Sequence, residues 1–306
     1  MPEDTITAVN APIALVTCTQ HPGLTADDRL LVPALERLGH PARPALWDDP
    51  AERWGAYGAV VIRSTWDYHH RLAEFLAWLD RLERESAPVL NRIPILRWNV
   101  AKTYLRDLEA AGVPVTPTVW VPMGSTTTLR EAMDAVRSDA LVVKPTVSAS
   151  AFETWRVYRS RSRDEEDRFA RLSAVRDLMI QPFLPVIETD GELSFVFVAG
   201  EFSHAVRKRP KPGDFRVQEE HGGTAVRERV TPDLVRQAAR ALSAAPEPPL
   251  YARADGVVVG GRLVITELEL VEPMLYFGWD PAAAGRLAGG IAGTLRERRG
   301  LEPRQD

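Results

Sequence analysis

The stretch that most constrains the fold of this chain is Tyr251–Leu270, which reads YARADGVVVGGRLVITELEL. Two β-rich runs flank a Gly-Gly pair, and this pattern predicts an antiparallel hairpin. Side chains alternate between the two faces of a strand, so Arg253 and Asp255 share one face of the first strand. By the same rule, Glu267 and Glu269 share one face of the second. Charged groups among Val, Ile and Leu are costly to desolvate unless something compensates them, and a divalent cation surrounded by phosphate oxygens would do so.

The register of this hairpin decides whether the charged groups meet. A two-residue turn at Gly260-Gly261 with regular pairing would place Asp255 opposite Thr266, on the face away from Glu267. A three-residue loop, or one bulge, places Asp255 opposite Glu267 instead. We predict this second register, which gathers three carboxylates and one arginine on one face. The alternative is the solvated outer face of an ordinary hairpin.

Chain length, net charge and cysteine count exclude several classes of protein. A chain of 306 residues can bury a large core, and its length favours two or three subdomains. The net charge of −4 argues against nucleic acid or an anionic membrane as a partner. The lone Cys18 excludes an intrachain disulfide. No apolar run is long enough to span a bilayer and the N-terminus lacks a secretory pattern, so we expect a soluble cytoplasmic protein.

Alternating predicted strands and helices over residues 11–95 indicate a small parallel α/β domain. Its expected strands are Ile13–Cys18, Pro44–Trp47 and Ala59–Thr65, and its main helix is Leu72–Glu85. The loop that leaves the last of these strands reads RSTWDY. Because such sheets hold ligands at the carboxyl ends of their strands, Ser64, Asp67 and Tyr68 are candidate small-molecule contacts. The alternative is that Asp67 only caps the next helix.

A second α/β piece is expected in the middle of the chain. Asn91–Asn99 contains a proline and is predicted to be a linker, and Val100–Ala111 is predicted to be a helix that carries Lys102. Lys144 lies inside the apolar predicted strand ALVVKP. A buried lysine needs an anion, although its side chain could also extend toward solvent. The small-residue loop Thr146–Thr154 follows directly and could close its backbone N–H groups over phosphates.

The C-terminal part is expected to begin as a meander of strands that leads toward the hairpin. Arg207–Gly223 lies between them, reads RKRPKPGDFRVQEEHGG, and is predicted to be a loop. Its basic residues suit oligophosphate or carboxylate, and the alternative is a solvated charged loop. His221 in this loop is either a proton carrier near neutral pH or a structural hydrogen-bond partner. Helices are expected from Thr231 and over Pro281–Arg298.

In the order of its elements and in these residues, the chain resembles the ATP-grasp superfamily of carboxylate–amine ligases over nearly its whole length. The resemblance implies an α/β (α+β) ATP-grasp fold. Its implied parts are an N-terminal α/β domain over residues 1–95, a central subdomain with a flexible lid over 96–183, and a C-terminal subdomain with a magnesium site over 184–306, with ATP held between the last two. The chain departs from the family's pattern in its lid, which has no glycine, and at Glu269, where an asparagine is usual.

The resemblance also implies roles for individual residues. Lys102 and Lys144 hold phosphates, and the hinge that begins at Gln181 reads adenine. Glu188 is placed for the ribose, and Arg253 faces the γ-phosphoryl group; Arg253 and Lys144 are implied catalytic residues. The implied nucleotide contacts are Lys102, Lys144, Ser148, Ser150, Gln181, Phe183, Leu184, Glu188 and Lys208. The implied ligands of two Mg²⁺ ions, with Mn²⁺ as the alternative metal, are Asp255, Glu267 and Glu269.

The implied substrate contacts lie in loops. The segment GDFRVQEEHGG is similar to the substrate and phosphate loop of bacterial glutathione synthetases. This similarity implies that Arg216 orients the acceptor carboxylate as a further catalytic residue, and it implies substrate roles for Gln218, Gly222 and Gly223. The segments RSTWDY, RWNVAKTYL and LELVEP resemble a narrower actinobacterial branch that includes the ligase closing the D-cycloserine ring.

The implied reaction is ATP-dependent activation of an amino acid-like carboxylate as an acyl phosphate, followed by attack of an amine nitrogen and release of ADP and phosphate. Ligation of two molecules and ring closure within one are both open. A small-molecule kinase on the same fold and a catalytically silent nucleotide-binding protein are open as well. The sequence does not decide the substrate's identity and stereochemistry, the nitrogen donor, or whether the chain forms a homodimer.

Overall fold

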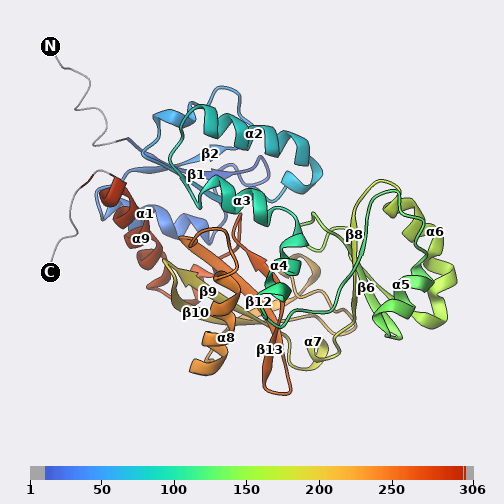
Figure 1. Cartoon of the computed structure of the whole chain (residues 1–306). Coiled ribbons are helices and arrows are strands. Elements are labelled where there is room, and N and C mark those ends of the chain that lie inside the picture. The colour runs from blue at the N-terminus through green and yellow to red at the C-terminus, as the bar shows by residue number, and fades with distance from the viewer. Residues whose placement is uncertain (1–10, 299, 301–306) are drawn as a thin grey trace, which may run out of the picture.

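The computed structural model describes residues 11–298 and residue 300. Three β-sheets organise this part of the chain. Figure 1 shows the N-terminal sheet above the C-terminal one, and the middle sheet to the right of both, with helices α5 and α6 on its outer side.

The N-terminal sheet is parallel, as predicted, with the strand order β2-β1-β3-β4. Its central strands are apolar and buried because helices cover the sheet. The strands are β1 (Ile13–Thr17), β2 (Ala42–Leu46), β3 (Ala59–Ser64) and β4 (Val89–Leu90). The helices are α1 (Leu31–Glu36) and α2 (Leu72–Arg84).

The middle and C-terminal sheets are antiparallel. The middle sheet has the order β5-β8-β6-β7, with β5 (Val119–Val121), β6 (Ala140–Pro145), β7 (Trp155–Tyr158), β8 (Leu178–Pro182), α5 (Leu129–Val136) and α6 (Ser162–Ser173). The C-terminal sheet has the order β11-β10-β9-β12-β13, with β9 (Glu192–Val198), β10 (Glu201–Arg209), β11 (Thr224–Glu228), β12 (Tyr251–Val259), β13 (Arg262–Glu269), α7 (Val186–Thr189), α8 (Pro232–Leu242) and α9 (Ala283–Arg298).

Two predictions about local structure are wrong. The expected linker Asn91–Asn99 contains helix α3 (Ile93–Asn99), because Pro94 lies in the first turn, where a missing N–H removes no helical hydrogen bond. It is followed by α4 (Leu105–Ala110). The expected loop Arg207–Gly223 begins later, since its first three residues continue β10 and pair with β9 and β11.

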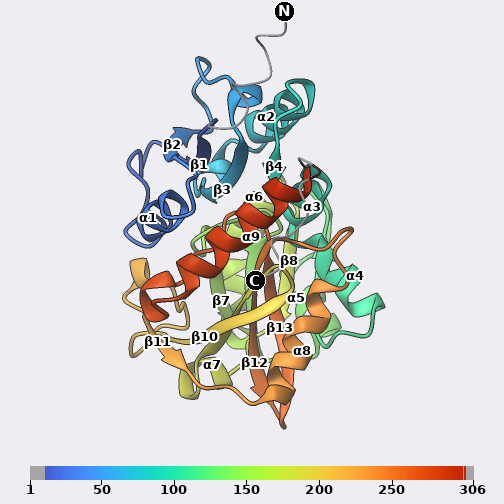
Figure 2. The ribbon, with the colours of Figure 1, turned by 90° about the vertical axis from the view of Figure 1, so that its left-hand side faces the viewer.

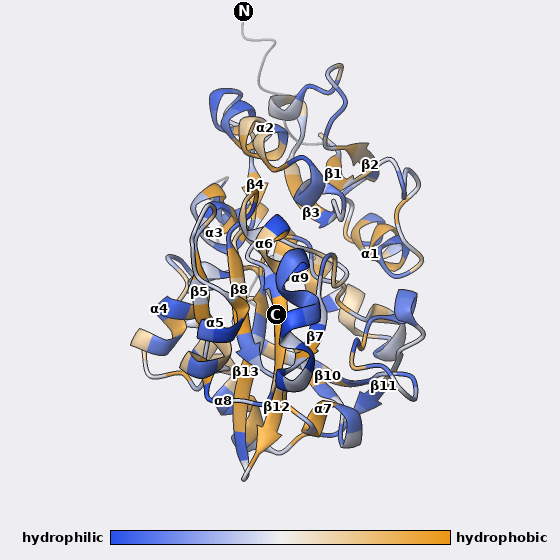
Figure 3. Ribbon diagram, turned by 90° about the vertical axis from the view of Figure 1, so that its right-hand side faces the viewer, coloured by the Kyte–Doolittle hydropathy of each residue, from blue (hydrophilic) through white to orange (hydrophobic). Residues whose placement is uncertain are grey.

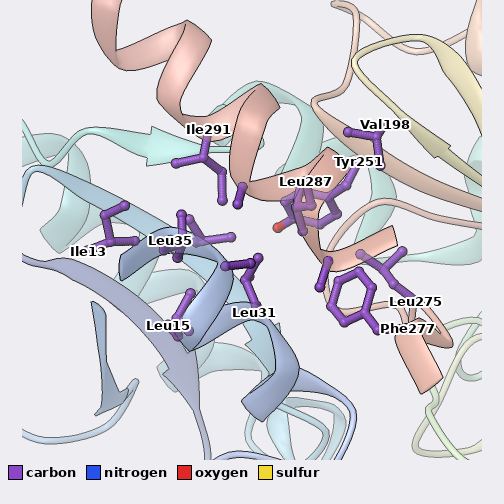
Figure 4. Packing of buried hydrophobic residues seen from close by; sticks show 14 of the residues in the cluster. Ile13, Leu15, Leu31, Leu35, Val198, Tyr251, Leu275, Phe277, Leu287 and Ile291 are labelled. Atoms are coloured by element: carbon purple, nitrogen blue, oxygen red, sulfur yellow. The ribbon is translucent and has the colours of Figure 1, made fainter. Parts of the chain in front are cut away.

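Helix α9, near the C-terminus, packs against helix α1 of the N-terminal part. It crosses between the N-terminal and C-terminal sheets in Figure 2, and its Leu287 and Ile291 pack in one buried cluster with Leu31 and Leu35 of α1. Figure 4 shows these side chains together with Tyr251 at the start of β12. Strands β8 and β12 are largely apolar in Figure 3, whereas the outer helices carry hydrophilic stretches. No helix within residues 11–298 is long and apolar enough to cross a membrane.

Two buried asparagines fix the hairpin relative to the N-terminal part. The Asn91 side-chain amide donates to the carbonyl oxygens of Tyr251 and Leu270, both at 2.8 Å. The Asn99 amide donates to the Leu268 carbonyl at 2.8 Å, and its oxygen accepts from the Leu270 N–H at 2.7 Å. These groups satisfy backbone atoms at the open end of the hairpin, where β12 begins and β13 ends. The charged face of the hairpin is therefore held at a defined position.

Candidate active site

The hairpin adopts the predicted register, and a bulge produces it. Asp255 lies opposite Glu267 and Arg253 opposite Glu269, whereas Gly256 lies opposite Ile265, so Thr266 is the extra residue. The turn itself is the tight one, with Val259 paired to Arg262 across two glycines at φ +58° and +78°. The bulge therefore shifts the pairing by one residue and brings the carboxylates to one face.

Three carboxylates converge at this face. The ligand oxygens of Asp255, Glu267 and Glu269 all lie within 4.8 Å of one another, and we call these residues the carboxylate cluster. Asp255 is 1% exposed and Arg253 is 7% exposed, so the alternative of a solvated outer face is wrong. Grouped oxygen ligands of this kind suit a hard divalent cation.

Protein cations surround the carboxylate cluster. Asp255 accepts from Lys208 Nζ at 2.7 Å and from Arg253 Nη2 at 2.9 Å. Arg253 also pairs with Glu269, and Lys102 Nζ lies 3.0 Å from Glu267. These pairs compensate the cost of holding several like charges together in a site of low exposure.

The pKa values of the cluster divide between its members. Burial would raise the pKa of Asp255, but Arg253 and Lys208 outweigh it and hold that pKa below its usual value. Burial likewise opposes ionisation of Glu267, yet Lys102 and Lys144 lower its pKa. Burial raises the pKa of Glu269 to about 7, because Arg253 only partly offsets it and the two neighbouring carboxylates repel. Two members are therefore ionised at neutral pH and the third titrates close to it.

The lysines of the site differ in their partners. Lys144, on β6, makes no ion pair with any described residue, and burial lowers its pKa. Lys102 donates to the Ser148 carbonyl at 2.6 Å besides pairing with Glu267. Lys208 lies between Asp255 and Glu192, each at 2.7 Å; burial alone would lower its pKa, but these carboxylates raise it. Lys144 is thus the cation most available to an anionic ligand.

A cavity of about 400 Å³ lies beside the carboxylate cluster and takes side chains from the middle and C-terminal sheets and from the loop after β3. It brings together most of the predicted site residues. Those that line it are Tyr68, Lys102, Lys144, Ser148, Ser150, Gln181, Leu184, Lys208, Arg216, Gln218, Arg253, Asp255, Glu267 and Glu269.

Six predicted site residues do not line this cavity, and the side-chain contacts that they make lie elsewhere. Ser64 Oγ lies 2.8 Å from the Thr17 hydroxyl, and Asp67 accepts from Trp47 Nε1 at 2.9 Å and pairs with Arg71 rather than capping a helix. Glu188 pairs with Arg156 at 2.6 Å on the outer side. The remaining three are Phe183, whose ring packs against that of Phe215, and Gly222 and Gly223, which close the charged loop.

The lid (Thr146–Thr154) contacts the protein on two sides. The Phe152 ring lies 5.1 Å from the His69 ring and 4.6 Å from the His70 ring, on the N-terminal part. On the other side, Ser150 Oγ donates to Glu220 at 3.2 Å, and its carbonyl oxygen lies 3.2 Å from His221 Nε2. His221 therefore has the structural hydrogen bond that was one of its two expected roles.

Three lid residues that are not glycine adopt a backbone conformation typical of glycine. Ser150, Ala151 and Glu153 have φ values of +50°, +55° and +49°, in the left-handed region that glycine adopts without cost. The lid thus keeps a conformation typical of glycine without containing one.

Among the cavity residues that were not predicted from the sequence are two acidic residues that are not exposed, Glu192 and Glu272. Glu192 accepts from Lys208 and, at 2.6 Å, from the Thr266 hydroxyl. Opposite charges on neighbouring strands were the sequence signal that could have indicated it. Glu192 and Lys208 are direct cross-strand partners on the β9–β10 pair. Glu272 follows the hairpin in a segment without regular structure, so no periodicity indicated where its side chain points.

Comparison with known proteins identifies the family. The family model described as the N-terminal domain of D-cycloserine synthetase DcsG matches residues 13–91. The cycloserine biosynthesis protein DcsG of Streptomyces lavendulae is 32% identical over 301 residues, which cover 93% of this chain and 99% of that protein. This chain belongs to the DcsG family of ATP-grasp ligases. The membership confirms the expected reaction class, an ATP-dependent carbon–nitrogen ligase.

Solved structures agree with this membership. The crystal structure of D-cycloserine synthetase DcsG matches this DcsG-family chain with a TM-score of 0.83 at 30% identity, covering 92% of this chain and 99% of that one. D-alanine–D-alanine ligase from Bacillus anthracis, complexed with ATP, matches with a TM-score of 0.69 at 13% identity, covering 95% and 99% of the two chains. The second likeness shows the fold alone, and together they confirm the predicted ATP-grasp fold.

Proposed function

We propose that this protein activates the carboxylate of an amino acid-like small molecule with ATP and joins it to a nitrogen atom. The observation that carries the proposal is the convergence of the carboxylate cluster, Arg253 and Lys144 on one cavity. In the first step, a substrate carboxylate oxygen bonds to the γ-phosphorus and ADP leaves. In the second, nitrogen bonds to the acyl carbon, phosphate leaves with that oxygen, and the nitrogen loses a proton.

The residues present fit magnesium. The carboxylate cluster supplies only oxygen ligands, and the lowered pKa values of Asp255 and Glu267 keep two of them ionised. When bound, Mg²⁺ would neutralise charge on the phosphate oxygens. A requirement for two ions, and tolerance of Mn²⁺, stay predictions, which titration of ADP release with each metal would check.

The chain's own residues have separable tasks in this proposal. Lys144 and Lys102 hold phosphate oxygens, and Arg253 faces the transferring phosphoryl group. Gln181 and Leu184 line the cavity and are proposed to contact the adenine base, whereas Glu188 does not line it and pairs with Arg156. The lid excludes water from the acyl phosphate.

On the substrate side, Arg216 is held by Asp214 at 2.8 Å, and with Gln218 it is proposed to orient the carboxylate. Of the predicted substrate contacts around the end of β3, Tyr68 lines the cavity. Ser64 and Asp67 instead hydrogen-bond with Thr17 and Trp47. Small amino acid-like molecules are therefore the proposed partners. A cytoplasmic location belongs to the same proposal, and a homodimer stays a prediction, to be tested by light scattering.

The first experiment measures ADP release with Mg-ATP over D- and L-amino acids, offered alone and in pairs. With an accepted carboxylate labelled with ¹⁸O, we expect one ¹⁸O atom in each released phosphate, because that oxygen leaves with the phosphoryl group. Phosphate that carries oxygen from solvent water instead would indicate simple ATP hydrolysis and would refute the ligase chemistry. Capture of the intermediate by hydroxylamine as a hydroxamate gives an independent readout.

Ring closure within one molecule is the second candidate, favoured by the 32% identity to a cycloserine biosynthesis protein. The same screen separates the two. Ring closure gives ADP with a single substrate and a product lighter by one water, whereas ligation requires two substrates and gives a product with the mass of both less one water.

A further inference from the structure

Among the described residues, all but two of the cavity's charged side chains that are not exposed have an ion-pair partner. Of its charged side chains that are not exposed, most have an ion-pair partner, namely Lys102, Glu192, Lys208, Arg216, Arg253, Asp255, Glu267 and Glu269. Within residues 11–298, Lys144 and Glu272 line the cavity without an ion pair. The unpaired cation suits phosphate, as proposed above. A positively charged ligand would likewise compensate the unpaired carboxyl group.

The backbone around Glu272 is fixed by the N-terminal part of the chain. The Glu272 carbonyl oxygen accepts from Trp66 Nε1 at 3.1 Å, and the next carbonyl, of Pro273, accepts from Arg63 Nη2 at 2.7 Å. Arg63 is fully buried and is itself paired with Asp28 at 3.0 Å. A carboxyl group presented from such a backbone has a defined position and loses little entropy when it binds a ligand.

The charge of this carboxyl group is poorly compensated by the part of the chain that the structure describes. Burial raises the pKa of Glu272 to about 8, and repulsion from Glu269 adds to the effect, while Lys102 and a hydrogen bond from Tyr68 oppose it. The group therefore gains from any cation that enters the cavity. A single carboxyl group is a poor site for Mg²⁺, which has the carboxylate cluster beside it. The aromatic side chains Trp66 and Tyr68 also line the cavity, and such groups attract organic cations.

We propose that Glu272 binds the ammonium group of the substrate, with Tyr68 and Trp66 beside it. This inference rests on the proposed function and deepens it, because it assigns the residue that recognises the substrate's amino group. That ammonium has two chemical sources, the α-amino group of the carboxylate that is activated, or the amine that attacks the acyl phosphate. The experiment has one arm for each.

The first arm compares carboxylates that differ only in the amino group. Alanine and serine, each as D and L forms, are tested against propionate and 3-hydroxypropionate with Mg-ATP and hydroxylamine, and hydroxamate formation is measured. For an α-ammonium group at Glu272, we expect about tenfold or higher kcat/KM for the amino acids than for their amino-free partners. Glu272→Gln should raise KM for the amino acids by about the same factor and leave the amino-free partners unchanged.

The second arm replaces hydroxylamine with methylamine and measures its KM. If Glu272 binds the incoming amine, Glu272→Gln raises this KM by about tenfold and leaves KM for the carboxylate unchanged. Glu272→Asp, which keeps the charge, should restore part of the effect in either arm. Glu219→Gln is the matched control, because Glu219 also lines the cavity but is exposed and has no ion pair among the described residues.

The outcomes separate this inference from the function on which it rests. A rise in one of the two KM values supports the ammonium site and names its source. Equal turnover of amino acids and amino-free carboxylates by the wild type, with both KM values unaffected by Glu272→Gln, would overturn it while leaving the ligase intact. No hydroxamate from any carboxylate would overturn the proposed function and the inference together. If Glu272→Gln melts at a lower temperature than wild type, the wild-type comparison decides the first arm, and recovery of the methylamine KM in Glu272→Asp decides the second.

Discussion

Replacement of Lys144 by methionine should have opposite effects on ATP binding and on stability. Lys144 is half-buried on β6 and has no ion pair among the described residues. A hydrogen bond to a charged group contributes about 1.5–3 kcal/mol, so its loss should weaken ATP binding by roughly 10- to 150-fold. The ligand-free protein should be as stable as wild type or more so, because methionine fills a similar volume without a charge to desolvate.

Lys102→Met is the matched comparison, since both lysines line the same cavity. Lys102 pairs with Glu267 at 3.0 Å and donates to the Ser148 carbonyl at 2.6 Å. Its loss leaves a carboxylate and a carbonyl without their donor. Because Glu267 keeps 27% of its side chain exposed, we expect a loss of about 2–3 kcal/mol in the free energy of unfolding rather than the full value for a buried pair.

Calorimetric titration with Mg-ATP and urea denaturation measure the two effects. The pH dependence of the stability difference between wild type and Lys144→Met gives a further check, because its sign follows from the pKa shift. The pKa of Lys144 is lowered in the folded protein, so between that pKa and the ordinary lysine value the unfolded chain binds more protons. Wild type should therefore gain stability relative to Lys144→Met as the pH rises through this window. Unchanged ATP affinity in Lys144→Met, or a loss of stability equal to that of Lys102→Met, would refute the reasoning.

Three further predictions concern the metal site, the lid and the hairpin. Asp255→Asn and Glu267→Gln should each abolish Mg-ATP turnover with an unchanged circular dichroism spectrum, and full activity in either variant would count against the carboxylate cluster as the metal site. Phe152→Ala removes the lid's contact with His69 and His70, so ADP release without product should rise several-fold in a coupled assay; unchanged coupling would mean that this contact does not hold the lid. Asn91→Ala leaves buried backbone groups at 2.6–2.8 Å without partners and should lower the free energy of unfolding by about 2–4 kcal/mol in urea, whereas an unshifted midpoint would show that water replaces the amide.

Much of the site could be predicted because its pattern is local. Strand β6 has the predicted bounds, since an apolar run that ends at a proline is recognisable without its neighbours. Side-chain alternation alone placed Arg253 with Asp255 and Glu267 with Glu269, and the predicted register then brought the two pairs to one face. The choice of register also followed from chemistry, because only one register gathers the three carboxylates where a divalent cation could compensate their charge.

The loops could not be predicted in the same way. Ser64, Asp67 and Tyr68 are near neighbours in the sequence, yet of these three only Tyr68 lines the cavity. Irregular backbone has no periodicity, so the direction of each side chain depends on tertiary partners such as Trp47 and Thr17. The same limit explains the wrong linker, because α3 gains most of its stability from packing and from the Asn99 side chain's contacts with the hairpin.

The amino-acid sequence by itself determined which charges share a face within each strand of the hairpin, because side-chain alternation is a property of the backbone. Only the tertiary structure decided which of those charges are neutralised. Lys208 and Lys102 come from distant segments to Asp255 and Glu267, while Lys144 and Glu272 are left without ion pairs among the described residues. Partnership between charges depends on distances across the fold, and these two uncompensated groups are where a ligand gains the most.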